Sequence, residues 1–438
     1  MDVKELSTLV SSNGSSVDRR VFFDNEIYRR EQSTVFADSW LFVAHQSQVP
    51  EVGDFVLSRM GEESVIVSRS RESCVHVSLN SCRHRGLPVC RADKGRASSF
   101  SCPYHGWTYS CDGSLKGMPD QARYYPDLIK SDLGLVQARV DSYKGLIFAT
   151  FNERAVGLEE YLGDSRFYLD TLVDRRGQAT EVIGVQKWRV KTNWKMPTEN
   201  MVGDVYHAAF SHRSVFDLHP DAKAAYAEIA SSYNIALDGG HGLTARVFEE
   251  GIALESRVPC EQQLLAMAPD VLAHYEANDE KTREHLGELR SRVKPATSAI
   301  FPNLHLLSTT YCLRVGHPIS ADETEIWSWI IVEKDMPDAM REAIKKNYYF
   351  LFGPEGMLEQ DDDENWTQVT EGSRGVQASK YPFHMSMGLN EKGEVGDQRP
   401  DLPGLVADAN SEHPQRNFYR HWHHCLMRGL DETVGENS

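Results

Sequence analysis

The spacing of apolar residues divides the chain into a strand-rich region and a longer mixed region. Between residues 40 and 156, short runs rich in β-branched residues are separated by clusters of Gly, Glu and Ser, a pattern typical of short strands. These runs are Phe55–Leu57, Ser64–Ser68, Val75–Leu79 and the apolar run Gly145–Phe151. We therefore expect a small all-β domain over residues 40–156.

The region after residue 156 alternates longer strands with helices. Strand periodicity runs through Glu181–Lys191, Leu304–Val315 and Glu325–Val332. Helical runs begin at Pro269-Asp270 and Pro337-Asp338, because proline is tolerated in the first turn of a helix. The order shows no βαβ rhythm. It predicts an α+β fold with a mainly antiparallel sheet covered by helices.

These patterns predict two domains. Residues 157–438 form the larger domain, and residues 1–39, which are polar and partly helical, are its N-terminal part. Within the larger domain, residues 389–411 are rich in Gly, Pro, Asp and Asn, which predicts a long surface loop.

Composition and charge narrow the class of protein. Of the 438 residues, 40% are hydrophobic and 25% are charged, as in soluble globular proteins. The net charge of −17 argues against nucleic acid or a membrane surface as the main partner. No segment has the length of a transmembrane span or the pattern of a secretion signal. Eight cysteines in so long a chain suggest no disulfide framework, so we expect reduced thiols in a cytoplasmic protein.

Four potential metal ligands lie close together in the smaller domain. Cys82 and His84 form Cys-x-His, and after 17 residues Cys102 and His105 form Cys-x-x-His. Two thiolates and two imidazoles in mixed pairs fit a Rieske [2Fe–2S] cluster, in which the cysteines hold one iron and the histidines the other. Structural zinc is the alternative, although zinc sites usually keep like ligands together. Neutral imidazoles raise the potential of such a cluster, which therefore needs an electron donor and an electron acceptor.

A second group of candidate ligands lies in the larger domain. Asp204 and His207 share a face of a helix, but His207 and His212 are five residues apart and diverge on a straight helix. For both histidines to bind one ion, the helix must end or bulge near Ser211. Two histidines and a carboxylate form the facial triad of non-haem Fe(II) oxygenases. The carboxylate is either Asp204 or a member of the acidic run Glu359–Glu364, and spacing alone does not choose between them.

Two unrelated histidines near a helix end are the simpler interpretation of that segment. The predicted cluster weakens it, because a cluster needs an electron acceptor.

These residues carry a family resemblance. Over nearly its whole length the chain resembles the large (α) subunit of Rieske-type aromatic-ring-hydroxylating dioxygenases, in particular the naphthalene, biphenyl and polycyclic-arene group. The matching motifs are CRHRG with CPYHGW, NWKMPTEN followed by MVGDVYH and SHR, WSWIIVEKDMP, FGPEGMLEQDD and QRNFYRHW.

The resemblance implies ligands and roles. The four residues of the smaller domain would hold the Rieske cluster, and His207, His212 and Asp362 would bind a mononuclear iron. Asp204 would instead connect, through hydrogen bonds, a cluster histidine of the neighbouring subunit with an iron-ligand histidine. A carboxylate in that position is the usual partner of a ligand imidazole.

The resemblance also implies partners and a reaction. The family forms rings of three α subunits, commonly with three small β subunits. Electrons from NADH arrive through a reductase and usually a ferredoxin, and O₂ is inserted into an arene to give a cis-dihydrodiol. This chain has no dinucleotide-binding fingerprint of its own.

By resemblance, six residues would line the substrate pocket: Asn200, Met201, Val205, Ala208, Phe352 and Leu358. Each is also consistent with ordinary packing. Met201 stands where an aromatic residue is common, and Met357-Leu358 replaces a Phe-Trp-like pair. The expected pocket is therefore roomier or differently shaped.

Two other functions remain open. One is a Rieske monooxygenase acting on an aromatic acid such as a salicylate-like compound, with Arg213 as a possible anchor for the carboxylate. The other is a pure electron carrier or a zinc-stapled binding protein, which would leave the larger domain without a purpose.

Overall fold

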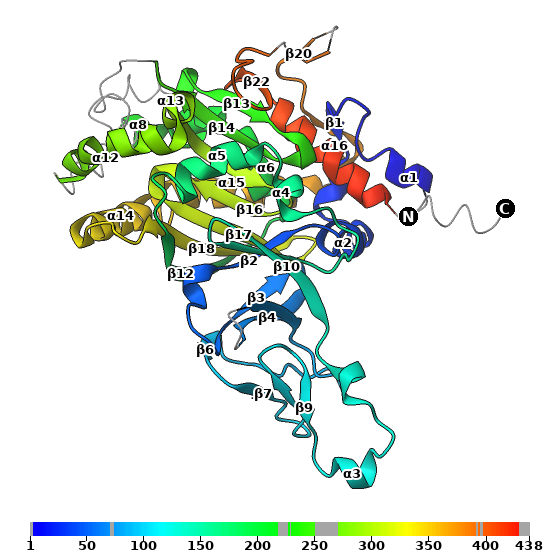
Figure 1. Cartoon of the computed structure of the whole chain (residues 1–438). Helices are drawn as coiled ribbons and strands as arrows, with labels where there is room; N and C mark the ends of the chain where they lie inside the picture. The colour runs from blue at the N-terminus through cyan, green and yellow to red at the C-terminus, as the bar shows by residue number, and fades with distance from the viewer. Residues whose placement is uncertain are drawn as a thin grey trace. The chain divides into compact units, whose positions relative to one another are not determined.

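The computed structural model describes residues 3–70, 74–217, 227, 229–249, 270–390, 393–394 and 397–428 (Figure 1). The chain forms two compact units. One is Phe36–Leu158, and the other combines Met1–Val35 with Glu159–Ser438. The expected boundaries, at residues 40 and 156, differ from these by a few residues.

The smaller unit is built on β-strands, as the sequence pattern predicts. Its main sheet is antiparallel, in the order β2-β11-β10-β5-β4-β3-β6. Its strands are β2 (Leu41–His45), β3 (Asp54–Met60), β4 (Glu63–Arg69), β5 (Val75–Leu79), β6 (Lys94–Arg96), β10 (Gln137–Tyr143) and β11 (Leu146–Thr150). A three-stranded sheet contains β7 (Ser99–Ser101), β8 (Thr108–Ser110) and β9 (Leu115–Gly117). The helical turns are η3 (Gln46–Gln48), α3 (Gln121–Tyr124) and η4 (Lys130–Leu133).

The larger unit contains an eight-stranded antiparallel sheet, so the predicted α+β class is confirmed. Its order is β12-β18-β17-β16-β15-β14-β13-β22. The strands are β12 (Thr180–Val190), β13 (Tyr233–Ala236), β14 (Gly242–Val247), β15 (Val293–Ile300), β16 (Leu304–Leu307), β17 (Cys312–Ser320), β18 (Glu323–Glu333) and β22 (Leu405–Asp408). Two short pairs join β1 (Ser16–Val17) with β19 (Phe383–His384) and β20 (Leu389–Asn390) with β21 (Gly393–Glu394).

Two expectations for the larger unit are wrong in detail. The segment Leu304–Val315 is a hairpin rather than one strand, because the chain reverses at η8 (Ser308–Thr310) and Tyr311 adopts a positive φ of 54°. The apolar pattern runs through the turn because both strands are buried. The expected surface loop at 389–411 contains the edge strand β22, which pairs with β13 through Val406 opposite Ile235.

Helices pack against this sheet. The helix α14 begins at Asp338, as the sequence predicts. The other predicted start, at Pro269-Asp270, borders residues outside the described part of the chain. The helices are α1 (Val3–Ser7), α2 (Asn25–Glu31), α4 (Leu158–Leu162), α5 (Ser165–Val173), α6 (Lys195–Gly203), α7 (Ala208–Ser211), α8 (Arg213–Asp217), α12 (Asp270–Leu286), α13 (Glu288–Ser291), α14 (Asp338–Leu351), α15 (Met357–Ser373) and α16 (His413–Met427). Shorter turns are η1 (Arg19–Phe22), η2 (Gln32–Phe36), η5 (Val205–His207), η6 (Asp238–Gly240) and η9 (Ala378–Lys380).

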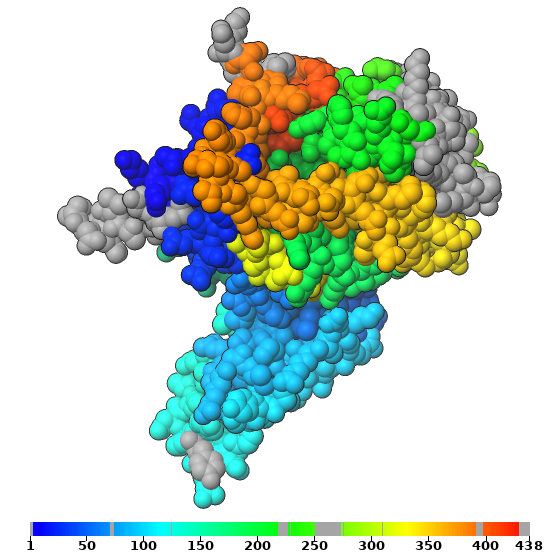
Figure 2. Space-filling view, turned by 180° about the vertical axis from the view of Figure 1, so that it is seen from behind, coloured from blue at the N-terminus to red at the C-terminus, as the bar shows by residue number. Residues whose placement is uncertain are grey.

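The placement of the helices brings distant parts of the chain together. The helix α6 contacts β14, β15 and α16, and α16 also contacts α1 (Figure 1). The residues from α14 through α15 and beyond form a gold-to-orange band across one face of the larger unit (Figure 2). Among the described helices, none has the length and apolar character needed to cross a membrane.

A buried ion pair fixes α6 between the two ends of the chain. Lys195 Nζ lies 2.5 Å from Glu31 Oε1, and both side chains are 0% exposed. Glu31 also accepts hydrogen bonds from the indole nitrogens of Trp194 and Trp422, each at 2.9 Å. Burial lowers the pKa of Lys195, and the adjacent carboxylate opposes that effect. The Glu31 carboxylate of α2 therefore accepts hydrogen bonds from Lys195 in α6, from Trp194 just before α6 and from Trp422 in α16.

We predict that Glu31→Ala strongly destabilises the larger unit. The change leaves the Lys195 ammonium buried without a counter-charge, which typically costs about 3–5 kcal/mol. Urea unfolding followed by circular dichroism measures the loss. Glu342→Ala is the control, because it breaks the exposed Lys345–Glu342 pair and should cost less than about 1 kcal/mol. Equal effects of the two variants would contradict this account.

Candidate metal centres

Two matching loops carry the four candidate ligands of the smaller unit. In each loop the cysteine carbonyl accepts a hydrogen bond from the glycine four residues later, Gly86 after Cys82 at 2.8 Å and Gly106 after Cys102 at 3.0 Å. Both glycines have positive φ values, 74° and 72°, which few other residues adopt at low cost. The repeated cysteine-to-glycine spacing thus gives two turns of the same shape.

The loops bring the four side chains to one place. Cys82 and Cys102 are each 3% exposed and belong to the same apolar cluster. The rings of His84 and His105 lie 4.5 Å apart between centroids, at 71° to each other. His84 stacks on Trp107 with an interplanar angle of 7°. Trp107, which belongs to the same apolar cluster as the two cysteines, therefore links them to the paired histidine rings.

The state of His84 fits a metal ligand. Its Nδ1 is buried and has no hydrogen-bond partner among the described residues. Burial, helped by the neighbouring His105, lowers the pKa of His84 and favours the neutral imidazole that a metal requires. A buried nitrogen with a free lone pair is costly unless it binds something, so this donor set fits the iron of a cluster.

Tyr109 adds a hydrogen-bond donor beside one thiolate. Its hydroxyl oxygen lies 3.3 Å from Cys82 Sγ and accepts a hydrogen bond from Arg83 N at 3.0 Å. Burial raises the pKa of Tyr109, so the hydroxyl stays protonated and can donate a hydrogen bond to the sulfur. Such a bond stabilises the more negative, reduced form of a cluster. The spacing of the ligands alone does not indicate Tyr109.

The second centre depends on a break in the helices of the larger unit. The helix α6 ends at Gly203, the turn η5 carries His207, and α7 ends at Ser211. His212 caps α7 with φ −97° and ψ 17°, outside the helical region. The expected helix end near Ser211 is therefore confirmed, and it turns the second imidazole toward the first.

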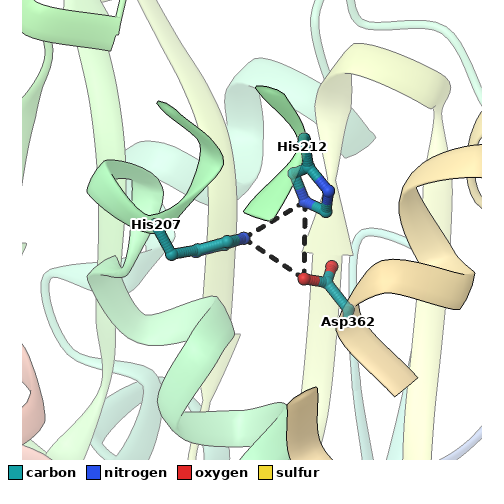
Figure 3. A group of neighbouring side chains, drawn as sticks. All are labelled: His207, His212 and Asp362. Carbon is teal, nitrogen blue, oxygen red and sulfur yellow. Dashed lines mark hydrogen bonds and ion pairs between the residues drawn. The ribbon is translucent and has the colours of Figure 1, made fainter. Parts of the chain in front are cut away.

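Three donor atoms converge at this break (Figure 3). Asp362 Oδ1 of α15 lies 3.2 Å from His207 Nε2 and 3.4 Å from His212 Nε2. The two Nε2 atoms are 3.2 Å apart. The structure thus brings Asp362, rather than Asp204, to the two histidines. Two imidazoles and one carboxylate are the donor set of a non-haem iron site.

The charges at this site favour a bound cation. Burial opposes ionisation of Asp362, yet its contacts with His207 and His212 hold its pKa at about 2. Burial also disfavours a proton on His207, but Asp204 and Asp362 raise its pKa well above the usual range. The site therefore favours a positive charge among its side chains. A divalent ion supplies that charge when it replaces the proton.

Each of the two histidines also has a carboxylate near its other ring nitrogen, and His207 Nδ1 donates a hydrogen bond to the backbone oxygen of Asp204. His207 Nδ1 lies 3.4 Å from Asp204 Oδ2, and His212 Nδ1 lies 3.1 Å from Asp361 Oδ2. Such carboxylates fix the tautomer and the orientation of a ligand imidazole. Asp204 stands out in the sequence near His207, whereas Asp361 does not, although Asp361 belongs to the acidic run that supplies Asp362.

The six expected pocket residues are divided between elements that carry the triad and elements next to them in the chain. Asn200 and Met201 are buried in α6, and Asn200 Nδ2 lies 3.5 Å from His207 Nδ1. Val205 is in η5, and the buried Ala208 begins α7. The two others border α15, with Phe352 following α14 and Leu358 lying one turn before Asp362.

Comparison with known proteins identifies the family. A Rieske [2Fe-2S] domain model matches residues 39–144, and a model of the ring hydroxylating alpha subunit (catalytic domain) matches residues 158–427. The chain belongs to the ring-hydroxylating α-subunit family. It is therefore a ring-hydroxylating dioxygenase α subunit that uses a Rieske cluster and a mononuclear iron, and the zinc and electron-carrier alternatives are wrong.

Named relatives agree with the family models. The biphenyl 2,3-dioxygenase subunit alpha of Rhodococcus jostii is 36% identical over 428 residues, which are 95% of this chain and 90% of that protein. The benzene 1,2-dioxygenase subunit alpha of Pseudomonas putida is 35% identical over 433 residues, 96% of this chain and 93% of that protein. A structure of naphthalene 1,2-dioxygenase with bound indole has a TM-score of 0.86 and 31% identity, covering 96% of this chain and 94% of that one.

We predict that Tyr109→Phe lowers the reduction potential of the cluster by tens of millivolts. The variant loses the hydroxyl that donates toward Cys82 Sγ, so the reduced cluster is less stabilised. A redox titration followed by visible absorbance measures the shift. Tyr143→Phe, in β10 of the same unit, is the control and should leave the potential unchanged. An unchanged potential in Tyr109→Phe would contradict the proposed hydrogen bond.

We predict that Asp361→Asn weakens iron binding at the triad by about 10- to 100-fold. The variant replaces the carboxylate that faces His212 Nδ1 with a neutral amide. Equilibrium titration with Fe²⁺ against a competing chelator measures the affinity. Asp217→Asn is the matched control, because Asp217 is exposed and contacts Arg213 rather than a ligand. Equal affinities in the two variants would show that Asp361 does not support His212.

Proposed function

We propose that this chain is the terminal oxygenase subunit that cis-dihydroxylates a polycyclic or substituted arene with O₂ and with electrons from NADH. The proposal rests on one observation above all: a single chain combines the two cysteine–histidine loops with the His207, His212 and Asp362 triad. The named relatives that act on biphenyl, benzene and naphthalene support a neutral aromatic substrate.

Each group of residues would have a separate role in the reaction. Cys82, Cys102, His84 and His105 hold the cluster, and the triad holds the iron. When bound, the iron activates O₂ and the cluster supplies electrons one at a time. Asp204 and Asp361 keep the two ligand imidazoles in the required tautomer and orientation. Asn200, Met201, Val205, Ala208, Phe352 and Leu358 surround the substrate and exclude water from it.

The site supports a neutral arene better than an aromatic acid. Arg213 is the residue next to His212 that could anchor a substrate carboxylate. Its side chain is 74% exposed, and its Nε lies 3.3 Å from Asp217 Oδ2. An exposed guanidinium that already has a carboxylate partner offers a poor anchor. Hydroxylation of a salicylate-like acid therefore remains the second candidate.

The partners follow from the same proposal. A reductase and a ferredoxin in the cytoplasm would deliver electrons, and three α subunits would assemble with three small β subunits. The edge of the cluster suits contact with a neighbouring subunit, since Tyr104 stacks on His105 with 3.8 Å between ring centroids and is 56% exposed. In that assembly Asp204 would connect the cluster of the neighbouring subunit with His207.

Product analysis with the reconstituted system tests the substrate class. The α subunit, its small β subunit, a ferredoxin, a reductase and NADH would be supplied with a panel of arenes and aromatic acids. We expect cis-dihydrodiols from arenes. Monohydroxylated products from the acids alone would favour the second candidate instead.

We predict that His207→Ala abolishes turnover while the cluster keeps its visible absorbance. The variant removes one of the three donors at the iron but changes nothing in the cluster loops. Product formation and absorbance are measured on the same preparation. His424→Ala is the matched control, because His424 is exposed on α16 and should retain turnover. Wild-type turnover in His207→Ala would contradict the assignment of the iron site.

A further inference from the structure

One buried arginine contacts both the predicted pocket and the helix that carries Asp362. Arg314 lies in β17 and its side chain is 1% exposed. Its Nη2 donates to the backbone oxygen of Phe352 at 2.6 Å and to Glu359 Oε2 at 2.5 Å. Its guanidinium carbon also lies 5.5 Å from the ring centroids of Trp188 and Phe352. None of these contacts belongs to the iron ligands themselves.

The charges on α15 explain why a cation is needed there. Glu359, Asp362 and Asp363 are related as i, i+3 and i+4, so they share one helix face. The Glu359 side chain is 0% exposed and that of Asp362 is 3% exposed. Burial raises the pKa of Glu359, the Arg314 guanidinium opposes this and favours the ionised carboxylate, and the two neighbouring aspartates add to the rise. Without a cation beside them, these three crowded carboxylates would repel one another.

We infer that Arg314 is a positioning residue that fixes Asp362 against the two histidines. Its Nη2 joins the end of α14, at Phe352, to the first turn of α15, at Glu359. Asp362 follows Glu359 by three residues on the same helix face, so the position of that turn sets the position of the Asp362 carboxylate. The same guanidinium holds the backbone of a predicted pocket residue. This inference rests on the proposed iron site and deepens it.

A guanidinium suits this task better than an ammonium. The guanidinium of Arg314 is planar and always charged, and it lies near two aromatic rings while it donates to two acceptors. Lysine would keep the charge but lose the planar contacts. Arg314→Lys should therefore lose iron more slowly than a neutral substitution does. If only packing volume mattered, retaining the charge would give no such improvement.

The chain offers a matched control for the loss of a buried arginine. Arg176 forms an ion pair with Glu333 at the end of β18, and the two side chains are only 4% and 8% exposed. Neither residue contacts the triad or the predicted pocket in the described part of the chain. Arg176→Met thus removes a buried cation from the same unit without touching α15.

The experiment compares Arg314→Met, Arg314→Lys and Arg176→Met in the complete oxygenase. A chelator specific for Fe²⁺ is added, and the rate of loss of the mononuclear iron is followed together with cluster absorbance and the melting temperature. We expect Arg314→Met to lose iron at least about tenfold faster than the wild type, with the cluster absorbance unchanged. Arg314→Lys should lie between the two. Arg176→Met should lower the melting temperature but lose iron at the wild-type rate.

Two results would overturn the inference. One is iron loss from Arg314→Met at the wild-type rate, and the other is equally rapid loss from Arg176→Met, which would indicate a general effect of stability. If Arg314→Met does not fold, Arg314→Lys and Glu359→Gln carry the same comparison. A wild-type enzyme that holds iron but does not hydroxylate arenes would contradict the proposed function and leave the role of Arg314 standing.

Discussion

The proposed iron site depends on the contact of one buried carboxylate with two imidazoles. Asp362 reaches His207 and His212 from a helix far along the chain, so the sheet, α6, α7 and α15 must all be in place before the three donors meet. The cost of burying this carboxylate is offset by the imidazoles, which keep its pKa at about 2. The helix α15 holds this charge against the two histidines.

Supporting polar groups act on both sides of that contact. The Glu31–Lys195 pair fixes the start of α6, which leads to Asp204 and His207. The Arg314–Glu359 pair fixes the start of α15, which leads to Asp362. Buried ion pairs contribute little net stability when compared with apolar packing, but removing one partner is costly. The two buried ion pairs therefore hold their helices in one position and add little to the free energy of unfolding.

The sequence alone predicts the cluster site more completely than the iron site, and the reason is distance along the chain. The four cluster ligands lie between Cys82 and His105, and each pair occupies one short loop with its own glycine. The spacing of residues within each loop is therefore enough to predict how the cluster ligands are arranged. The choice between Asp204 and Asp362 depends on how α15 packs, which no local pattern records; the family resemblance supplies Asp362. Asp361 and Arg314 are missed for the same reason, and the strand β22 is missed because its four residues lie within a loop-like composition.

We propose that one chain holds both a Rieske cluster and a separate iron at the His207, His212 and Asp362 triad. Analysis of iron and acid-labile sulfide before and after treatment with an Fe²⁺ chelator tests it most directly. We expect about three irons for every two sulfides before treatment. After treatment the ratio of iron to sulfide should fall to about one while the cluster absorbance persists. A ratio of one before treatment in an active enzyme, or stoichiometric zinc in place of iron, would contradict it.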